Sequence, residues 1–248
     1  MPVIKILNTS DTLVVAVTGY GNKLSLPVDD FFKKSGLEYA SRIVISDTTK
    51  MKTLAGVYPD FVSFDDLLLY IKSVISENNY KSLIVTGVSA GAHTALLLGH
   101  LLDADQVVAF APYPYLSYNE VKRQKDPILH SHKKMLAKFN ELPESIKKNF
   151  DLAKVLNRWN GITEYYIHVS RYNKIDYKRA TYLSGLPKVY IITHPYKEHA
   201  VASMLSHDSL LKKCFSLPFY KDNIFKEGYL NFTFKFSRFT QSLMKIIT

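Results

Sequence analysis

The sequence predicts an α/β fold in which a doubly wound, mostly parallel sheet carries helices on both faces. Short apolar runs rich in β-branched residues recur along the chain, and runs of this length are typical of strands buried on both faces. Stretches with helical periodicity lie between them. Strands that alternate with helices indicate βαβ units. The 248 residues suit a single domain of this class, spanning 1–248.

The predicted strands span residues 12–17, 42–46, 82–86, 106–110, 164–169 and 188–193. One helix follows from the apolar stripe between Phe64 and Ile75, with Ser63 as its N-cap. Small residues in 92–102 predict a second helix that packs close to the sheet. Near the C-terminus, aromatic residues alternate with polar ones over 232–236, which favours an edge strand.

The section at about 113–160 interrupts this alternation. It is rich in Lys, contains three prolines, and has amphipathic stretches at 133–142 and 145–159. Because it lies between two predicted strands, it is interpreted as a helical lid inserted over the active end of the sheet. Ordinary crossover helices are the alternative.

Composition limits the classes of partner. The net charge of +10 favours acidic partners, but the basic residues are spread along the chain and form no recognised nucleic-acid module. Cys214 is the single cysteine, so the chain has no internal disulfide and no cysteine metal cluster. The apolar run 83–102 contains a Gly-Val-Ser-Ala-Gly turn, which favours a strand and a helix over a membrane span. We therefore expect a soluble, cytoplasmic protein whose oligomeric state stays open.

The strongest chemical signal is the G-x-S-x-G motif at 87–91, with a predicted strand before it and a predicted helix after it. This turn holds its serine in a strained conformation, and glycines flank it because a Cβ would collide with neighbouring backbone. It also places the hydroxyl at a helix N-terminus, where developing negative charge is favoured. Ser89 is therefore the predicted nucleophile. A merely tight strand–helix turn is the alternative.

A serine hydroxyl needs a base, and this motif's usual chain order is serine, acid, histidine. His194, His199 and His207 all follow the last predicted strand. His199 is the preferred base because a loop turns into a helix there, and the other two stay as alternatives. Asp176 follows the strand 164–169 and is the predicted acid, which would hold the tautomer of His199. Its alternative role is N-cap of a helix at 177–183.

The same chemistry requires backbone donors for an oxyanion. The Thr18–Asn22 loop follows the first predicted strand and contains two glycines. One predicted donor is the N–H of Ala90, and the other is the N–H of Gly19 or of Tyr20. A plain glycine-rich turn is the alternative for this loop.

Taken in order, these features resemble the α/β-hydrolase superfamily. They resemble more closely a bacterial group of hydrolase-like proteins found with polysaccharide and glycan biosynthesis. The matching segments are 17–21, 42–47 followed by Gly56, 87–99, 108–112, Asp176 and 199–201. His93 departs from the pattern of many relatives, and either shapes the pocket or packs beside the helix. The glycan association comes from the resemblance alone.

The resemblance and the ordered residues lead to three hypotheses. The first is a serine esterase that hydrolyses a small-molecule or glycan ester, in particular an acyl ester on a carbohydrate, through an acyl-serine and without metal or organic cofactor. The second is an acyltransferase that passes the acyl group to a sugar hydroxyl. The third is a hydrolase-like scaffold that binds a glycan or a protein without turnover.

Overall fold

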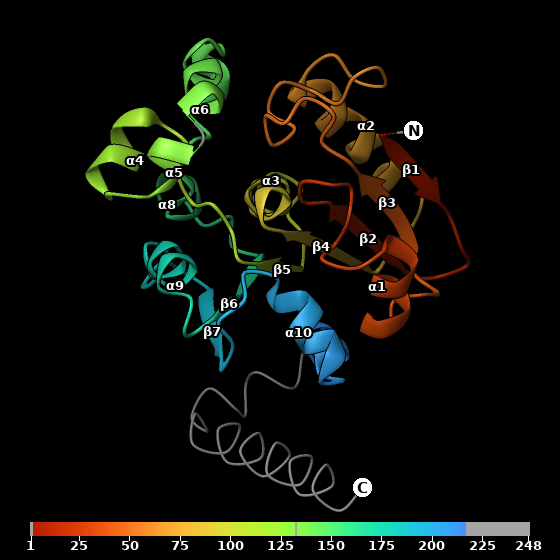
Figure 1. Cartoon of the computed structure of the whole chain (residues 1–248). Coiled ribbons are helices and arrows are strands. Elements are labelled where there is room, and N and C mark those ends of the chain that lie inside the picture. The colour runs from red at the N-terminus through yellow and green to blue at the C-terminus, as the bar shows by residue number, and fades with distance from the viewer. Residues whose placement is uncertain (1, 132, 217–248) are drawn as a thin grey trace, which may run out of the picture.

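A computed structural model describes residues 2–131 and 133–216 of the chain (Figure 1). One sheet holds seven strands in the order β1-β3-β2-β4-β5-β6-β7. The strands are β1 (Val3–Ile6), β2 (Thr12–Val17), β3 (Ser41–Ile45), β4 (Ser82–Val88), β5 (Gln106–Phe110), β6 (Glu164–Ser170) and β7 (Val189–His194). The edge strand β1 runs antiparallel to β3, and every other neighbouring pair is parallel. The predicted α/β class with a mostly parallel sheet is confirmed.

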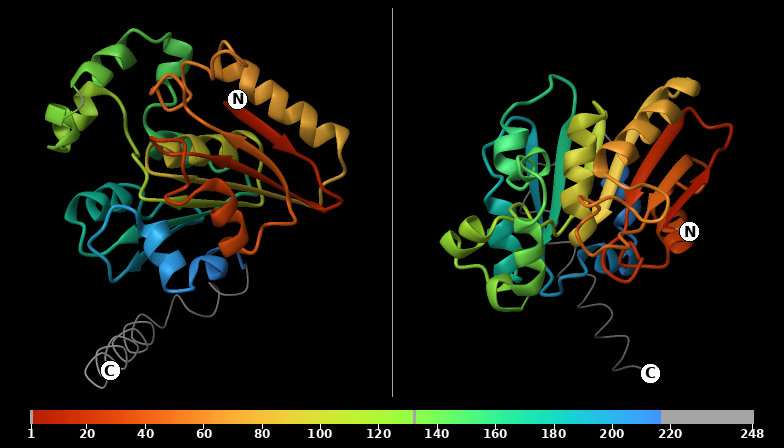
Figure 2. Two further views of the ribbon diagram at one scale, coloured as in Figure 1. Left: turned by 45° about the vertical axis from the view of Figure 1, so that its right-hand side comes forward. Right: turned by 90° about the horizontal axis from the view of Figure 1, so that it is seen from above.

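Helices cover both faces of the sheet (Figure 2). They are α1 (Val28–Ser35), α2 (Phe64–Glu77), α3 (Ala90–Leu101), α4 (Tyr118–Arg123), α5 (Ile128–Ser131), α6 (Lys133–Asn140), α7 (Glu144–Lys147), α8 (Leu152–Leu156), α9 (Lys174–Thr181) and α10 (Val201–His207), with a 3-10 turn η1 (Leu211–Phe215). One apolar cluster joins α2, α3, α8 and the α9 region to one face. A second cluster joins α1, α10 and η1 to the other. The molecule thus has three layers, with the sheet in the middle.

The alternation of side chains along the central strand β2 explains the two clusters. Leu13, Val15 and Val17 belong to the first cluster, whereas Val14 and Ala16 belong to the second. Successive residues of a strand point to opposite faces. A continuous apolar run therefore contributes side chains to the apolar clusters on both faces of the sheet, as the sequence predicts.

A capping residue positions α2 and a glycine positions α3, the two helices that the sequence predicts. Ser63 caps α2 by accepting a hydrogen bond from the N–H of Asp66, as predicted. In α3, a Cβ on Gly99 would lie 2.1 Å from Cγ2 of Val107 on β5. Glycine is therefore required there for α3 to lie directly on the sheet.

The connection between β5 and β6, residues 111–163, contains α4 to α8. Its buried side chains, among them Leu136, Phe139 and Phe150, join the same apolar cluster as α3. Figure 2 shows α4, α5 and α6 standing away from the sheet. That this connection acts as a lid, and that the chain forms one domain, stay predictions.

Two further expectations concern the C-terminus and the membrane. The edge strand expected at 232–236 lies outside the described residues. Among the helices that the structure describes, none has the length and apolar character needed to cross a bilayer. The run 83–102 divides instead into strand β4 and helix α3.

Candidate active site

Ser89 lies on a sharp turn between the end of β4 and the start of α3. Its backbone angles are φ 52° and ψ −116°, a region that costs a residue with a side chain about 1–3 kcal/mol. A Cβ on Gly87 would lie 2.6 Å from the carbonyl oxygen of Gly91, and a Cβ on Gly91 would lie 2.3 Å from that of Thr18. Only glycine fits at either position, so the steric reason predicted for the motif is confirmed.

The turn brings Ser89 together with His199 and Asp176. Nε2 of His199 lies 2.8 Å from Oγ of Ser89, and Nδ1 of the same ring lies 2.7 Å from Oδ2 of Asp176. The side chain of Asp176 is 3% exposed, whereas that of His199 is 41% exposed. A hydroxyl, an imidazole and a buried carboxylate thus form one hydrogen-bonded line that is open to solvent at its hydroxyl end.

Strand β6 and the loop after β7 position the imidazole. Ser170, at the end of β6, donates a hydrogen bond from its hydroxyl to the carbonyl of Glu198 at 2.5 Å. The N–H of Tyr172 donates to the carbonyl of Tyr196 at 3.0 Å. These bonds tie the loop of His199 to the segment that leads into Asp176, so one short stretch of backbone places both groups.

The predicted N-cap role of Asp176 is wrong. Helix α9 begins earlier than expected, at Lys174, and its cap is Asn173, whose side chain accepts a hydrogen bond from the N–H of Asp176. The carboxylate of Asp176 therefore lies in the first helical turn, where it is free to contact His199.

Backbone donors near the hydroxyl come from two segments. A Cβ built on Gly19 would lie 3.7 Å from Cβ of Ser89, which shows how closely the 18–22 loop approaches the serine. The N–H of Gly19 is used, because it donates to the carbonyl of Lys23 at 2.9 Å. Within the described chain, the N–H groups of Tyr20 and Ala90 donate to no protein acceptor. Of the two alternatives in this loop, Tyr20 is therefore the available donor.

His93, His194 and His207 have hydrogen-bond partners other than Ser89. His207 is 78% exposed and contacts Asp208. His93 is fully buried on α3, with Nδ1 2.7 Å from the carbonyl of Tyr113. It packs beside its helix, one of its two predicted roles. His194 on β7 lies with its Nε2 2.9 Å from Nδ1 of His168, on the face where Cys214 is buried.

The His168–His194 pair leads to a prediction about acid stability. Burial lowers the pKa of His194 to about 4, and burial together with the charge of His194 holds the pKa of His168 well below its ordinary range. In the unfolded chain both have a pKa of about 6.5. As the pH falls, these two histidines therefore take up protons in the unfolded chain at a higher pH than in the folded chain. We expect the free energy of unfolding to be undiminished above about pH 6.5 and to fall by about 2–3 kcal/mol for His194 alone as the pH approaches 4.

Urea denaturation between pH 7.5 and 4.5 measures this loss. His194→Phe should flatten the pH dependence, and His207→Phe, at the exposed histidine, should leave it unchanged. An unchanged slope in His194→Phe would contradict the assignment.

Sequence reasoning missed a buried ion-pair network behind Asp176. The guanidinium of Arg179 donates two hydrogen bonds to Asp126, both at 2.7 Å, and lies 3.5 Å from Oδ1 of Asp176. It also lies 4.2 Å from the centre of the Tyr113 ring, whose own centre is 6.4 Å from that of His199. Burial alone would raise the pKa of Asp126, but the hydrogen bonds from Arg179, Ile128 and Tyr115, together with the charge of Arg179, outweigh burial and lower it.

One sequence signal pointed to part of this network. Arg179 follows Asp176 by three residues, a spacing that brings side chains together on a helix. Nothing in the sequence pointed to Asp126, because it is 53 positions away from Arg179 in the connection between β5 and β6. The network therefore joins that connection to the acid of the site.

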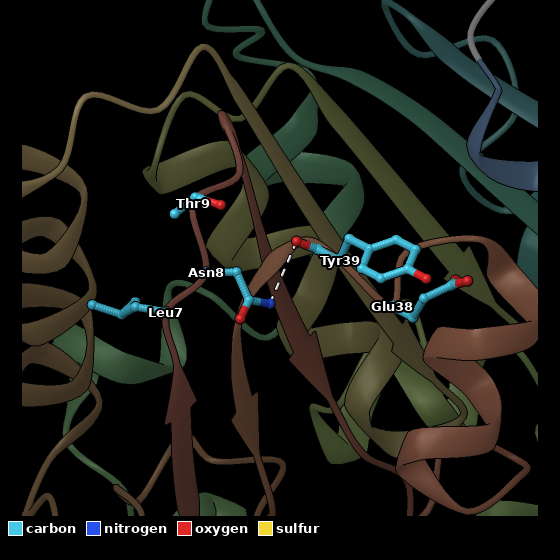
Figure 3. A pocket seen from close by; sticks show the side chains of 5 residues that line it. All are labelled: Leu7, Asn8, Thr9, Glu38 and Tyr39. Carbon is cyan, nitrogen blue, oxygen red and sulfur yellow. Dashed lines mark hydrogen bonds between the residues drawn. The ribbon is translucent and has the colours of Figure 1, made fainter.

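An open hollow lies at the other end of the sheet (Figure 3). It is lined by Leu7, Asn8, Thr9, Glu38 and Tyr39, which precede β2 and β3, whereas Ser89 follows the end of β4. No group of three potential metal ligands occurs among residues 2–131 and 133–216. The candidate active site is therefore the Ser89 cluster.

Comparisons with known proteins bear on the fold. No family model matches the chain, and no curated protein matches its sequence. Solved structures do match. A Staphylococcus aureus protein of unknown function is 13% identical over 85% of this chain and 91% of its own, with a TM-score of 0.59.

Two enzymes show a comparable likeness. A metagenome-derived lipolytic enzyme is 10% identical over 85% of this chain and 97% of its own, with a TM-score of 0.54. An S-formylglutathione hydrolase from Agrobacterium tumefaciens is 9% identical over 84% of this chain and 86% of its own, also with a TM-score of 0.54. The seven-stranded sheet, its flanking helices and these neighbours together show that the chain has the α/β-hydrolase fold.

Proposed function

We propose that the protein is a serine esterase that uses Ser89, His199 and Asp176. The observation that carries the proposal is the continuous line from the Ser89 hydroxyl through His199 to Asp176, with heavy-atom distances of 2.8 and 2.7 Å. Both distances lie within the range for proton transfer between a nucleophile and its base. Structural neighbours that are lipolytic enzymes and hydrolases support the same chemistry.

In this mechanism Ser89 attacks the ester carbonyl while Nε2 of His199 takes the hydroxyl proton. Asp176 accepts a hydrogen bond from Nδ1–H, which fixes the tautomer and stabilises the imidazolium. The imidazolium then protonates the leaving alcohol, and an acyl-serine remains. Water activated by His199 attacks the acyl-serine, and the acid is released.

The negative charge on the tetrahedral intermediate needs donors that are in place before the reaction. Ala90 follows Ser89 in the chain and Tyr20 follows Gly19, which approaches the serine; the N–H groups of Ala90 and Tyr20 have no protein acceptor among the described residues. We infer that they form the oxyanion hole. Such a donor is typically worth about 3–4 kcal/mol of barrier.

The substrate we propose is an acyl ester on a carbohydrate, which rests on the resemblance to glycan-associated hydrolase-like proteins. Acyl transfer to a sugar hydroxyl uses the same acyl-serine and differs only in the acceptor. The ratio of acid to acylated sugar, measured with a sugar present, separates the two.

A fluorophosphonate probe tests the proposal directly, because it reacts covalently with an activated serine hydroxyl. We expect the wild-type chain to be labelled at Ser89 and Ser89→Ala to remain unlabelled. Ser73→Ala removes an exposed hydroxyl from α2 and should label like the wild type. Absence of labelling in a folded wild-type chain would favour a binding protein without turnover.

A further inference from the structure

Lys52 is a buried lysine that the mechanism above does not use. It lies between β3 and α2, is 1% exposed, and has a left-handed backbone with φ 53°. Its N–H donates to Oδ2 of Asp47 at 2.7 Å, and its carbonyl accepts a hydrogen bond from the hydroxyl of Thr94 on α3 at 2.5 Å. The backbone of Lys52 is thus fixed against the helix that begins after Ser89.

Aromatic rings surround the ammonium group. Nζ lies 5.0 Å from the ring centre of Tyr113, 5.1 Å from that of Phe139 and 5.8 Å from that of Tyr20. Its polar contacts are long, at 3.5 Å to the hydroxyl of Tyr20 and 3.7 Å to Sδ of Met135. An ammonium carries three donors, so its two long contacts leave one donor without a partner among the described residues and hold the other two only weakly.

No carboxylate in the described chain forms an ion pair with Nζ. Asp47 is the acid whose charge acts on Lys52, but its oxygens accept hydrogen bonds from the backbone N–H groups of Lys52 and Thr49. The neighbouring cation Arg179 is paired with Asp126. A buried charge without a counter-ion is costly, and burial lowers the pKa of Lys52 to about 7.

Two residues place this ammonium beside the reacting groups. Tyr20 contributes a proposed oxyanion donor from its backbone, and its hydroxyl contacts Nζ. The centre of the Tyr113 ring lies 5.0 Å from Nζ and 6.4 Å from the centre of the His199 ring, so Nζ is at most 11.4 Å from the centre of that imidazole. A small ester can span this separation.

We propose that Lys52 is the anion-recognition group of the site and binds a carboxylate carried by the ester substrate. This inference rests on the proposed function. The carboxylate would take the place of the weak thioether contact from Met135 on α6, and would supply the counter-ion that the ammonium lacks. The surrounding rings exclude water, which strengthens the ion pair.

Ligand binding tests the inference without turnover. In the Ser89→Ala chain, we expect glutarate to bind, and the added substitution Lys52→Met to raise its dissociation constant by about 10- to 100-fold, as for the loss of a hydrogen bond to a charged group. Lys134→Met removes an exposed charge from α6 and should leave the constant unchanged. Lys52→Gln serves as a second variant, and thermal unfolding verifies that each chain is folded.

Equal glutarate binding by the Lys52 variants, or no binding by the Ser89→Ala chain, would overturn the inference. Tighter binding of inorganic phosphate than of glutarate would overturn the assignment of a carboxylate. Because Ser89→Ala does not turn over, these outcomes are independent of whether the chain is an esterase.

Kinetics then show where the carboxylate lies in the substrate. We compare p-nitrophenyl hemiglutarate with p-nitrophenyl butyrate, and an acetylated glucuronate with an acetylated glucose. Lys52→Met should lower the ratio of kcat/KM for the anionic ester to that for the neutral ester by about 10- to 100-fold in one of the two pairs. A ratio unchanged in both pairs contradicts the inference, whereas no hydrolysis of any ester by the wild type contradicts the proposed function.

Discussion

Replacing Ser89 or His199 by alanine is expected to lower kcat/KM for an activated ester by about 10⁴-fold or more, with the fold intact. Ser89→Ala removes the nucleophile, and His199→Ala leaves the hydroxyl without a base, so each breaks the same line of hydrogen bonds. Losses of this size are usual for such groups, and because they act as a unit, the double variant should be little worse than either single one. Steady-state hydrolysis together with thermal unfolding measures both quantities.

Two further variants sharpen this test. Asp176→Asn should lose a comparable or smaller amount of activity, because it retains the shape of the side chain and disturbs the tautomer of His199. His207→Ala is the matched control, since His207 also contacts an aspartate, at 3.1 Å, whereas the Ser89 hydroxyl is bonded to His199. Activity near the wild-type level in Asp176→Asn would refute the role of that carboxylate.

Removing Asp126 is expected to produce the largest loss of stability. The side chains of Asp126 and Arg179 are 2% and 8% exposed, and Asp126→Ala would leave the guanidinium buried without its bidentate partner. Breaking one side of a buried ion pair typically costs about 3–5 kcal/mol. Tyr115, whose hydroxyl donates to Oδ2 of Asp126, would also lose its partner. Urea denaturation at neutral pH measures the change.

An exposed ion pair provides the control. Asp11 and Lys81 approach to 2.6 Å, but their side chains are 62% and 80% exposed, so solvent screens their attraction. Asp11→Ala should therefore change the free energy of unfolding much less than Asp126→Ala. Similar losses in the two variants would show that the contact behind Asp176 contributes no more than a surface contact.

The sequence predicted strands and the turn around Ser89 correctly, because in each case a short run of residues has a single physical explanation. Six of the seven strands follow from short runs rich in apolar and β-branched residues, and the glycines around Ser89 follow from backbone contacts that exclude a Cβ. Strand β1 was not predicted, because only Val3 among its residues is buried and an edge strand of four residues carries little hydrophobic signal. The chain order of the motif led to the prediction that Ser89, His199 and Asp176 lie together, and the structure brings their side chains into contact; their catalytic roles stay a proposal.

The parts that sequence did not indicate depend on contacts between distant segments. Lys52 and Asp126 look like ordinary surface residues, and only the tertiary structure shows that both are buried. The choice between Gly19 and Tyr20 as donor depended on a single hydrogen bond to Lys23. The N-cap of α9 was misplaced because Asn173 and Asp176 are both suitable cap residues, and periodicity does not define where a short helix begins.

At Gly91, the start of α3 contacts the backbone of Val17 and Thr18 with no side chain between them, and this contact separates two kinds of evolutionary change. Backbone in direct contact with backbone cannot adjust by changing a side-chain rotamer. The position of Ser89 is therefore set by the main chain of the sheet. The residues that cover Lys52, by contrast, come largely from outside this frame, including Met135 and Phe139 of α6. Substitutions in α6 can therefore change the surroundings of Lys52 while the Ser89 hydroxyl keeps its place.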